Sequence, residues 1–265
     1  MNSILIFGCG NMGGAMLAGW LAGGLAPERF TVVDPYLQTV PAGVTLLREL
    51  PQQHFDAILL GVKPQMLDDV APLLASVAAQ DTVLFSILAG VELASLAARF
   101  PAVGAIVRIM PNLAAAIGKS PMALFGQGLD EAGQAQVTDL LRPLGTPEWL
   151  GAESEFDLVT ALAGCGPGFV YRFIDALAAG AARLGLDPAQ AERLAVATVE
   201  GAAQLAAASP HSPAELAARV ASPGGSTQKG LDVLDEGEAL LGLIEATLRA
   251  SRNRNAEMAK AAREG

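Results

Sequence analysis

A glycine-rich stretch near the start of the chain constrains the fold more than any other feature. Residues 7–16 read FGCGNMGGAM, between a short apolar run at 4–7 and a helical pattern at 15–22. The stretch contains three glycines in the G-x-G-x-x-G spacing: Gly8, Gly10 and Gly13. A second apolar run at 31–33 ends on Asp34. This strand–turn–helix context with a following acidic residue predicts a dinucleotide-binding Rossmann fold, and a glycine-rich connector without a ligand is the alternative.

Each residue of the glycine stretch has a physical role in such a fold. Gly8 permits the tight turn, Gly10 lets the backbone approach a pyrophosphate, and Gly13 permits close helix–strand packing. The amides of the first helical turn favour negative charge, so we expect Asn11 and Met12 to contact the cofactor as well. Asp34 should bind the ribose hydroxyls, and the alternative is that it caps the turn that begins at Pro35.

The rest of the chain alternates strands with short helices and then becomes helical. Further strands are expected at residues 57–62, 82–88, 103–109 and 122–126, and the alternation implies parallel pairing through crossovers. Helices are expected at residues 155–163, 167–184, 188–208, 213–220 and 238–262. The chain is therefore predicted to be an α/β protein, with a Rossmann domain at 1–152 and an all-α domain at 153–265.

Composition excludes several function classes. Hydrophobic residues make up 52% of the 265, but they are not contiguous, and the apolar run Ile4–Phe7 is too short for a signal sequence, so we expect a cytoplasmic protein without membrane segments. The net charge of −10 argues against nucleic acid as a partner. The two cysteines and two histidines have no metal-ligand spacing, and neither a disulfide framework nor a metal is expected.

Three loops follow predicted strands and should line the cofactor. They read LGVKPQ at 60–65, ILAGV at 87–91 and RIMPN at 108–112. Ligands in open α/β sheets bind outside the carboxyl ends of the strands. The predicted cofactor contacts in these loops are Val62, Lys63, Pro64, Ala89, Gly90, Met110, Pro111 and Asn112. A solvated charge is the alternative for Lys63.

A second anion site is predicted in the helical half. Residues 222–227 read SPGGST, a glycine pair followed by hydroxyls that open a helix. Because the glycine stretch already serves the pyrophosphate, this loop should serve a substrate carboxylate. An interhelical turn capped by Ser226 is the alternative.

The order of these motifs resembles that of the pyrroline-5-carboxylate reductase family. The resemblance rests on GCGNMGGAM, GVKP at 61–64, AGV at 89–91, MPN at 110–112, GCGPGF at 164–169 and SPGGST, and it spans nearly the whole chain. It implies reduction of 1-pyrroline-5-carboxylate to L-proline by a nicotinamide cofactor, NADPH by family default. It also implies substrate binding by Glu153, Gly225, Ser226 and Thr227, with the Thr227 hydroxyl near the ring nitrogen.

The chain departs from the family pattern at several positions. Leu113 and Ala114 follow MPN where Thr-Pro is usual, Cys165 and Gly168 replace a common Ser and Ala, and Arg219 stands where an amide is frequent. A buried small residue is the expected role of Cys165, and a redox role is the alternative.

The mechanism expected from these residues needs little side-chain chemistry. No histidine lies inside a motif, and no Ser-His-Asp or Cys-His constellation is present, so Thr227 or a water it holds is the candidate contact for the imine nitrogen. Because the second strand ends in TVVDPY, Asp34 predicts that NADH is accepted at least as well as NADPH. Arg48 is the basic candidate after this strand, and the sequence alone does not place it at the site.

Two other functions are alternatives. A β-hydroxyacid dehydrogenase shares the glycine-rich start, but GCGPGFVYRFID lacks the lysine and asparagine that serve the hydroxyl in that class. A non-catalytic nucleotide-sensing regulator could keep the Rossmann half, and the intact SPGGST loop argues against it. The alanine- and glycine-rich helical half predicts a homo-oligomer built on a dimer, and the resemblance implies a ring of dimers.

Overall fold

The computed structural model describes residues 1–264 and divides them into two compact units. The first unit comprises Met1–Cys165 with the chain from Ala250 onward, and the second comprises Gly166–Arg249. These units do not follow the expected boundary between residues 152 and 153, because the segment after Glu153 packs with the first unit. There Phe156 is buried with Met110 and Ala123. The two units are defined by packing alone, so the division into functional domains at 1–152 and 153–265 stays a prediction.

The first unit is built on one eight-stranded sheet in the order β3-β2-β1-β4-β5-β6-β7-β8. The strands are β1 Ile4–Phe7, β2 Phe30–Val33, β3 Thr45–Leu47, β4 Ala57–Leu60, β5 Val83–Ser86, β6 Ala105–Met110, β7 Ser120–Gln127 and β8 Gly145–Trp149. The central strands β2, β4, β5 and β6 are buried along their whole length. Such burial is what a mostly parallel sheet covered on both faces requires.

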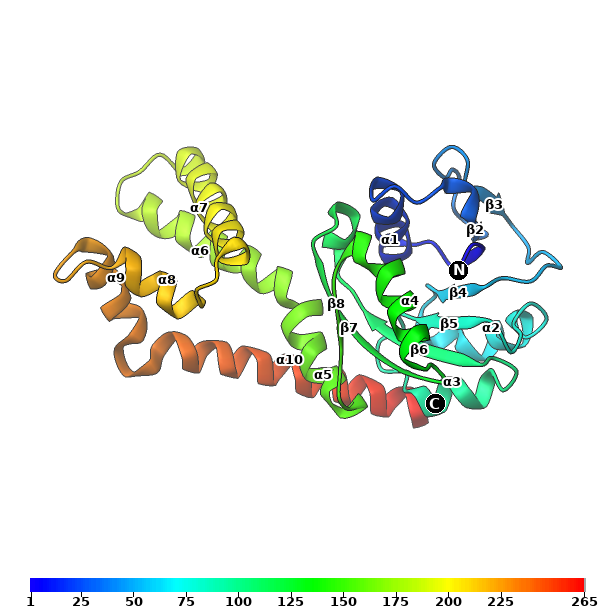
Figure 1. The fold of residues 1–265 in the computed structure, drawn as a ribbon. Helices are drawn as coiled ribbons and strands as arrows, with labels where there is room; N and C mark the ends of the chain where they lie inside the picture. The colour runs from blue at the N-terminus through cyan, green and yellow to red at the C-terminus, as the bar shows by residue number, and fades with distance from the viewer. Residues whose placement is uncertain (265) are drawn as a thin grey trace. The chain divides into compact units, whose positions relative to one another are not determined.

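Helices cover both faces of the sheet (Figure 1). On one face α1 (Asn11–Ala22) and α4 (Glu131–Leu141) pack their apolar side chains with β1 and β4 residues such as Ile6 and Leu59. On the other face α2 (Leu67–Leu74) and α3 (Leu93–Arg99) pack with the alternate residues, such as Leu5 and Ile58. Residues next to each other in a strand point to opposite faces, so each strand contributes to both cores.

Short helical turns connect these elements. The 3-10 turns are Pro27–Arg29, Pro64–Met66, Leu113–Ile117, Arg142–Leu144, Glu153–Glu155 and Glu236–Glu238. The expected helix at 155–163 is instead the turn at Glu153–Glu155, α5 (Phe156–Val159) and a π-helical segment, Thr160–Gly164. In that segment the amide of Cys165 donates to the carbonyl oxygen of Thr160 at 2.9 Å.

The sheet differs from the expectation in two ways. β7 runs antiparallel to β6, whereas parallel pairing was expected throughout. Residues 111–119 are too few for the crossover that a parallel pair needs, so the chain returns antiparallel. The two edge strands, β3 and β8, were not predicted, because one has only three residues and the other contains Pro147. Proline is tolerated in an edge strand, where one side of the backbone needs no partner.

The helix after the glycine turn also begins earlier than predicted. α1 starts at Asn11 rather than at residue 15, and Gly13 lies inside it. A side chain at Gly13 would place its Cβ 2.9 Å from the carbonyl oxygen of Gly8. Glycine is therefore required at this position for the helix to pack this closely.

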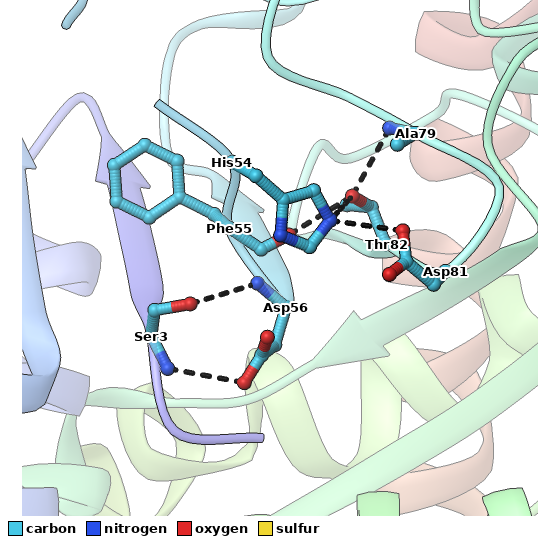
Figure 2. A network of polar contacts seen from close by, with 7 residues as sticks. All are labelled: Ser3, His54, Phe55, Asp56, Ala79, Asp81 and Thr82. Carbon is cyan, nitrogen blue, oxygen red and sulfur yellow. Dashed lines mark hydrogen bonds and ion pairs between the residues drawn. The ribbon is translucent and has the colours of Figure 1, made fainter. Parts of the chain in front are cut away.

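Polar side chains tie together the starts of three strands (Figure 2). Before β1 and β4, the amide of Ser3 donates to Asp56 Oδ2 at 3.2 Å and the amide of Asp56 donates to Ser3 Oγ at 3.0 Å. Before β5, Thr82 Oγ1 donates to the carbonyl oxygen of Phe55 at 2.9 Å and accepts from the amide of Ala79 at 3.1 Å. This edge lies opposite the carboxyl ends of the strands, and its polar network is structural.

The second unit is helical. Its helices are α6 Gly166–Arg183, α7 Pro188–Ala208, α8 Pro213–Val220, α9 Ser226–Asp235 and the first part of α10 Ala239–Glu264. Starts and ends agree with expectation to within two residues for α6, α7, α8 and α10, and α8 begins with a capping box between Ser212 and Glu215. No described helix is long and apolar enough to cross a membrane.

Candidate active site

A cleft of about 1010 Å³ opens at the carboxyl ends of β1, β2 and β4. Of the predicted cofactor contacts, it is lined by Gly8, Gly10, Asp34, Val62 and Lys63. Residues far apart in sequence are brought together here because β2 and β4 both pair with β1. The cleft therefore lies where an open α/β sheet binds its ligand.

Close backbone contacts shape the glycine turn at the base of the cleft. Gly8 has a φ of 85°, and a side chain at Gly61 would place its Cβ 2.1 Å from the carbonyl oxygen of Gly8. Gly10, by contrast, has nothing within 4 Å of the position its Cβ would take, so the backbone there is open. Gly10 is also the N-cap of α1, and no side chain caps that helix. The first-turn amides of α1 are thus available to an anion.

Asp34 contacts the glycine turn and its own turn at once. Its Oδ2 accepts from the amide of Cys9 at 2.9 Å, and its Oδ1 accepts from the amides of Tyr36 at 2.8 Å and Leu37 at 3.0 Å. Burial opposes its ionisation, but these hydrogen bonds and the charge of Arg48 outweigh that effect and hold the pKa of Asp34 below its usual value. Asp34 therefore caps the turn, as the alternative held, and also lines the cleft.

Arg48 lines the same cleft next to Asp34. Its Nη1 donates to the carbonyl oxygens of Asp34 at 2.8 Å and Leu37 at 2.5 Å. Sequence reasoning could not place Arg48, because the strand that carries it there, β3, was not predicted. A basic residue directly after a short β-branched and apolar run was the available signal.

The other predicted loops line two smaller cavities. Ala89, Gly90 and Met110 lie around one of them, together with Arg108, and Gly90 also lines a second cavity of about 230 Å³. Gly90 has a φ of 75°, which favours glycine. Arg108 lines both cavities although it is only 4% exposed.

Arg108 and Glu153 form a partly buried ion pair at these cavities. Arg108 Nη1 donates to Glu153 Oε1 at 2.6 Å, and the guanidinium carbon lies 4.0 Å from the centre of the Phe156 ring. Glu153 Oε1 also accepts from the amide of Leu93, the first residue of α3, at 2.8 Å. The predicted substrate-side glutamate is thus held through one oxygen. The sequence analysis did not identify Arg108 as a site residue. The available signal was a charged residue inside an otherwise apolar strand.

The remaining predicted cofactor contacts lie at element ends. Pro64 opens the 3-10 turn after β4, and Pro111 follows β6. Asn112 is buried, with its amide group accepting from the amide of Ala114 and donating to the carbonyl oxygen of Ala163, each at 2.9 Å. Its side chain therefore ties the end of β6 to the π-helical segment.

The predicted substrate loop belongs to the second unit. Gly225 is the N-cap of α9, Ser226 and Thr227 are its first residues, and no side chain caps the helix. Capping by Ser226, the alternative for this loop, is therefore wrong. Gly224 has a φ of 72°, and the amide of Gly225 donates to the carbonyl oxygen of Ser222 at 2.9 Å. Ser226 and Thr227 are exposed, so their hydroxyls lie at the surface at a helix start.

The cysteines are both free. Burial, followed by the charge of Asp34, raises the pKa of the Cys9 thiol to about 11, so it is neutral at pH 7. Among the described residues, no group of three or more His, Cys, Asp or Glu side chains is arranged to hold a metal ion.

The fold and the cleft define a class of protein. A twisted sheet with a glycine turn, an uncapped helix start and an acidic residue after β2 is the dinucleotide-binding arrangement. Residues 3–90 match a family model described as NADP oxidoreductase, coenzyme F420-dependent. The chain is an NAD(P)-dependent oxidoreductase.

Comparison with known proteins identifies the family. Residues 153–258 match the model for pyrroline-5-carboxylate reductase dimerisation. The chain is 32% identical to the pyrroline-5-carboxylate reductase of Pseudomonas aeruginosa, covering 97% of each, and 36% identical to that of Synechocystis, covering 96% of this chain and 97% of the relative. A solved pyrroline-5-carboxylate reductase from Coxiella burnetii superposes with a TM-score of 0.89 at 28% identity, covering 97% of this chain and 98% of that one. The chain belongs to the pyrroline-5-carboxylate reductase family.

Proposed function

We propose that this chain reduces the cyclic imine 1-pyrroline-5-carboxylate to L-proline, with NADH or NADPH as the hydride donor. The observation that carries the proposal is the similarity over nearly the whole length, which includes both the glycine turn and the SPGGST loop. The two parts serve different ligands, since one has the dinucleotide-binding arrangement and the other presents an uncapped helix start.

The residues of the first unit fit a dinucleotide. The open backbone at Gly10 and the uncapped start of α1 suit a pyrophosphate, and Asp34 lines the cleft where a ribose would lie. The proposed contacts are Gly8, Gly10, Asn11, Met12, Gly13, Asp34, Val62, Lys63, Pro64, Ala89, Gly90, Met110, Pro111 and Asn112. When bound, the cofactor supplies a hydride from its nicotinamide ring to the imine carbon.

The residues of the second unit orient the substrate in this proposal. The amides of Ser226 and Thr227 bind the carboxylate next to Gly225, because they open α9 without a side-chain cap. The hydroxyl of Thr227, or a water that it holds, contacts the ring nitrogen and delivers or admits the proton there. Glu153 contacts the substrate through Oε2, since Oε1 already accepts from Arg108 and Leu93.

The finer cofactor choice rests on Asp34. A carboxylate beside the ribose favours free 2′ and 3′ hydroxyls over a 2′-phosphate. The low pKa of Asp34 keeps it ionised at neutral pH. We therefore propose that NADH is accepted at least as well as NADPH.

The assembly and location follow the family. The helical second unit forms the core of a homodimer, and such dimers associate into a ring. We place the enzyme in the cytoplasm, where free cysteines such as Cys9 and Cys165 stay reduced.

A direct assay tests the proposed function. Oxidation of NADH or NADPH is followed at increasing 1-pyrroline-5-carboxylate, with L-proline quantified as the product. We expect equimolar proline and oxidised cofactor, and kcat/KM with NADH at least equal to that with NADPH. Oxidation of 3-hydroxy acids without proline formation would identify a β-hydroxyacid dehydrogenase. Cofactor binding without turnover would identify a regulator.

A further inference from the structure

Arg48 occupies a defined position beside the ribose end of the cleft. β3 pairs with β2 in parallel register, with Leu47 opposite Val33, so Arg48 and Asp34 follow the last paired residues. The amide of Asp34 also donates to the carbonyl oxygen of Leu47 at 3.2 Å. The two charged residues are therefore held side by side by the sheet.

The hydrogen bonds of Arg48 fix its guanidinium without using all of it. Both bonds, to the carbonyl oxygens of Asp34 and Leu37, come from Nη1. A guanidinium has five N–H donors, so Nη2 and Nε keep donors for another acceptor. The planar donors of arginine match a phosphate better than a point charge does.

The charges that line the cleft are unevenly placed. Asp34, Glu49 and Asp69 are acidic, and Arg48 and Lys63 are basic. Lys63 follows β4, which lies on the other side of β1 from β2. Among the described residues that line the cleft, Arg48 is thus the cation at the β2–β3 end, where the 2′ position of an adenosine ribose lies in this fold.

Asp34 is itself restrained from turning away. Both of its carboxylate oxygens accept from backbone amides, those of Cys9, Tyr36 and Leu37. A 2′-phosphate bound at this end would therefore meet the Asp34 charge, and only a neighbouring cation could offset the repulsion.

We propose that Arg48 binds the 2′-phosphate of NADPH and is the residue that permits this cofactor beside Asp34. The inference rests on the proposed function only in that the cleft is the dinucleotide site. It makes Arg48 a specificity-determining residue: Asp34 favours NADH, and Arg48 supplies the affinity for the 2′-phosphate.

Equilibrium binding of two adenosine fragments tests this role. Adenosine 2′,5′-bisphosphate carries the 2′-phosphate and adenosine 5′-diphosphate does not, and calorimetry gives Kd for each without substrate or nicotinamide. For Arg48→Ala we expect Kd for the 2′,5′-bisphosphate to rise at least tenfold and Kd for the diphosphate to change less than threefold. For Arg48→Lys, Kd for the 2′,5′-bisphosphate should lie between the values for wild type and Arg48→Ala. The lysine variant replaces the alanine variant if the latter fails to fold.

Arg142→Ala serves as the matched control. Arg142 is an exposed arginine after α4, with a side chain 70% exposed, and it lies outside the cleft lining. Its removal changes net charge equally and should leave both constants unchanged. If Arg48→Ala loses affinity for both fragments equally, Arg48 only supports the turn at 34–37. If it loses affinity for neither fragment, the 2′-phosphate binds elsewhere. Each result overturns the inference, whereas absent turnover with intact fragment binding overturns only the proposed reaction.

Discussion

At the residue scale, the proposed site depends on side chains that serve both the fold and the ligand. Asp34 accepts three backbone amides while it lines the cleft, and Glu153 is held by Arg108 while it is expected to contact substrate. Substitutions at such residues change structure and binding together. The informative measurements are therefore ratios between two ligands, in which a loss common to both cancels.

Replacing Asp34 with Ser should shift the cofactor ratio. The change removes the negative charge beside the ribose, so we expect kcat/KM for NADPH relative to NADH to rise tenfold or more, which is about 1.4 kcal/mol. Steady-state kinetics with both cofactors measure this ratio. Asp56→Asn is the control, because it removes a carboxylate at the opposite edge of the sheet and should leave the ratio unchanged. An unaltered ratio in Asp34→Ser would show that Asp34 only caps its turn.

Replacing Thr227 with Ala should slow turnover without weakening the binding of the cofactor. The exposed hydroxyl at the start of α9 is the proposed contact of the imine nitrogen. Its loss should cost about 1–3 kcal/mol in kcat/KM, or roughly 5- to 150-fold. Thr227→Ser keeps the hydroxyl and should retain most of the activity. Equal kinetics for wild type and Thr227→Ala would assign the loop a purely structural role.

At the element scale, the two ends of the parallel strands have different roles. The carboxyl ends of β1, β2 and β4 open into the cleft, whereas the starts of β1, β4 and β5 are tied by the network in Figure 2. At the carboxyl ends, the uncapped start of α1 and the unused donors of Arg48 are available to ligands. At the starts, the polar groups of the network are paired within the protein, which predicts effects on stability rather than on binding.

Replacing Thr82 with Val tests that difference. Thr82 is 1% exposed, and the valine keeps its shape but leaves the carbonyl of Phe55 and the amide of Ala79 without their partner. We expect a loss of about 1–3 kcal/mol in the free energy of unfolding in urea, with fragment binding unchanged. Asp81→Asn removes the exposed contact with His54 and should change stability by less than about 0.5 kcal/mol. Comparable losses in both variants would contradict the prediction.

At the scale of the whole molecule, the second unit leaves large apolar side chains uncovered. Tyr171, Leu205, Val233, Leu241 and Leu243 are each more than 60% exposed. In α6, α8 and α9 no residue is buried within the chain. Exposed apolar surface of this extent marks an interaction site, and a second copy of the chain is the proposed occupant.

Dimerisation should appear in both mass and stability. Light scattering at micromolar concentration should give at least twice the chain mass. The Tm should rise with protein concentration, because association stabilises only the folded state. A monomer with full reductase activity and a concentration-independent Tm would refute the proposal.

Local patterns were sufficient to predict most elements of this protein. The apolar runs of β1, β4, β5 and β6, the glycine turn with Asp34, and the proline-started helices α7 and α8 depend on neighbouring residues, so the sequence alone indicated them. The motifs also indicated the family, because their order spans both halves of the chain.

Long-range pairing decided the rest. The edge strands β3 and β8 are too short or irregular to be recognised alone, and they form because a neighbouring strand offers hydrogen bonds. The antiparallel β7, the Arg108–Glu153 pair and the placement of Arg48 beside Asp34 each join residues that are far apart in sequence. Such contacts arise only when the sheet assembles. For this reason the tertiary structure, and not the sequence, located Arg48, the residue that we propose binds the 2′-phosphate.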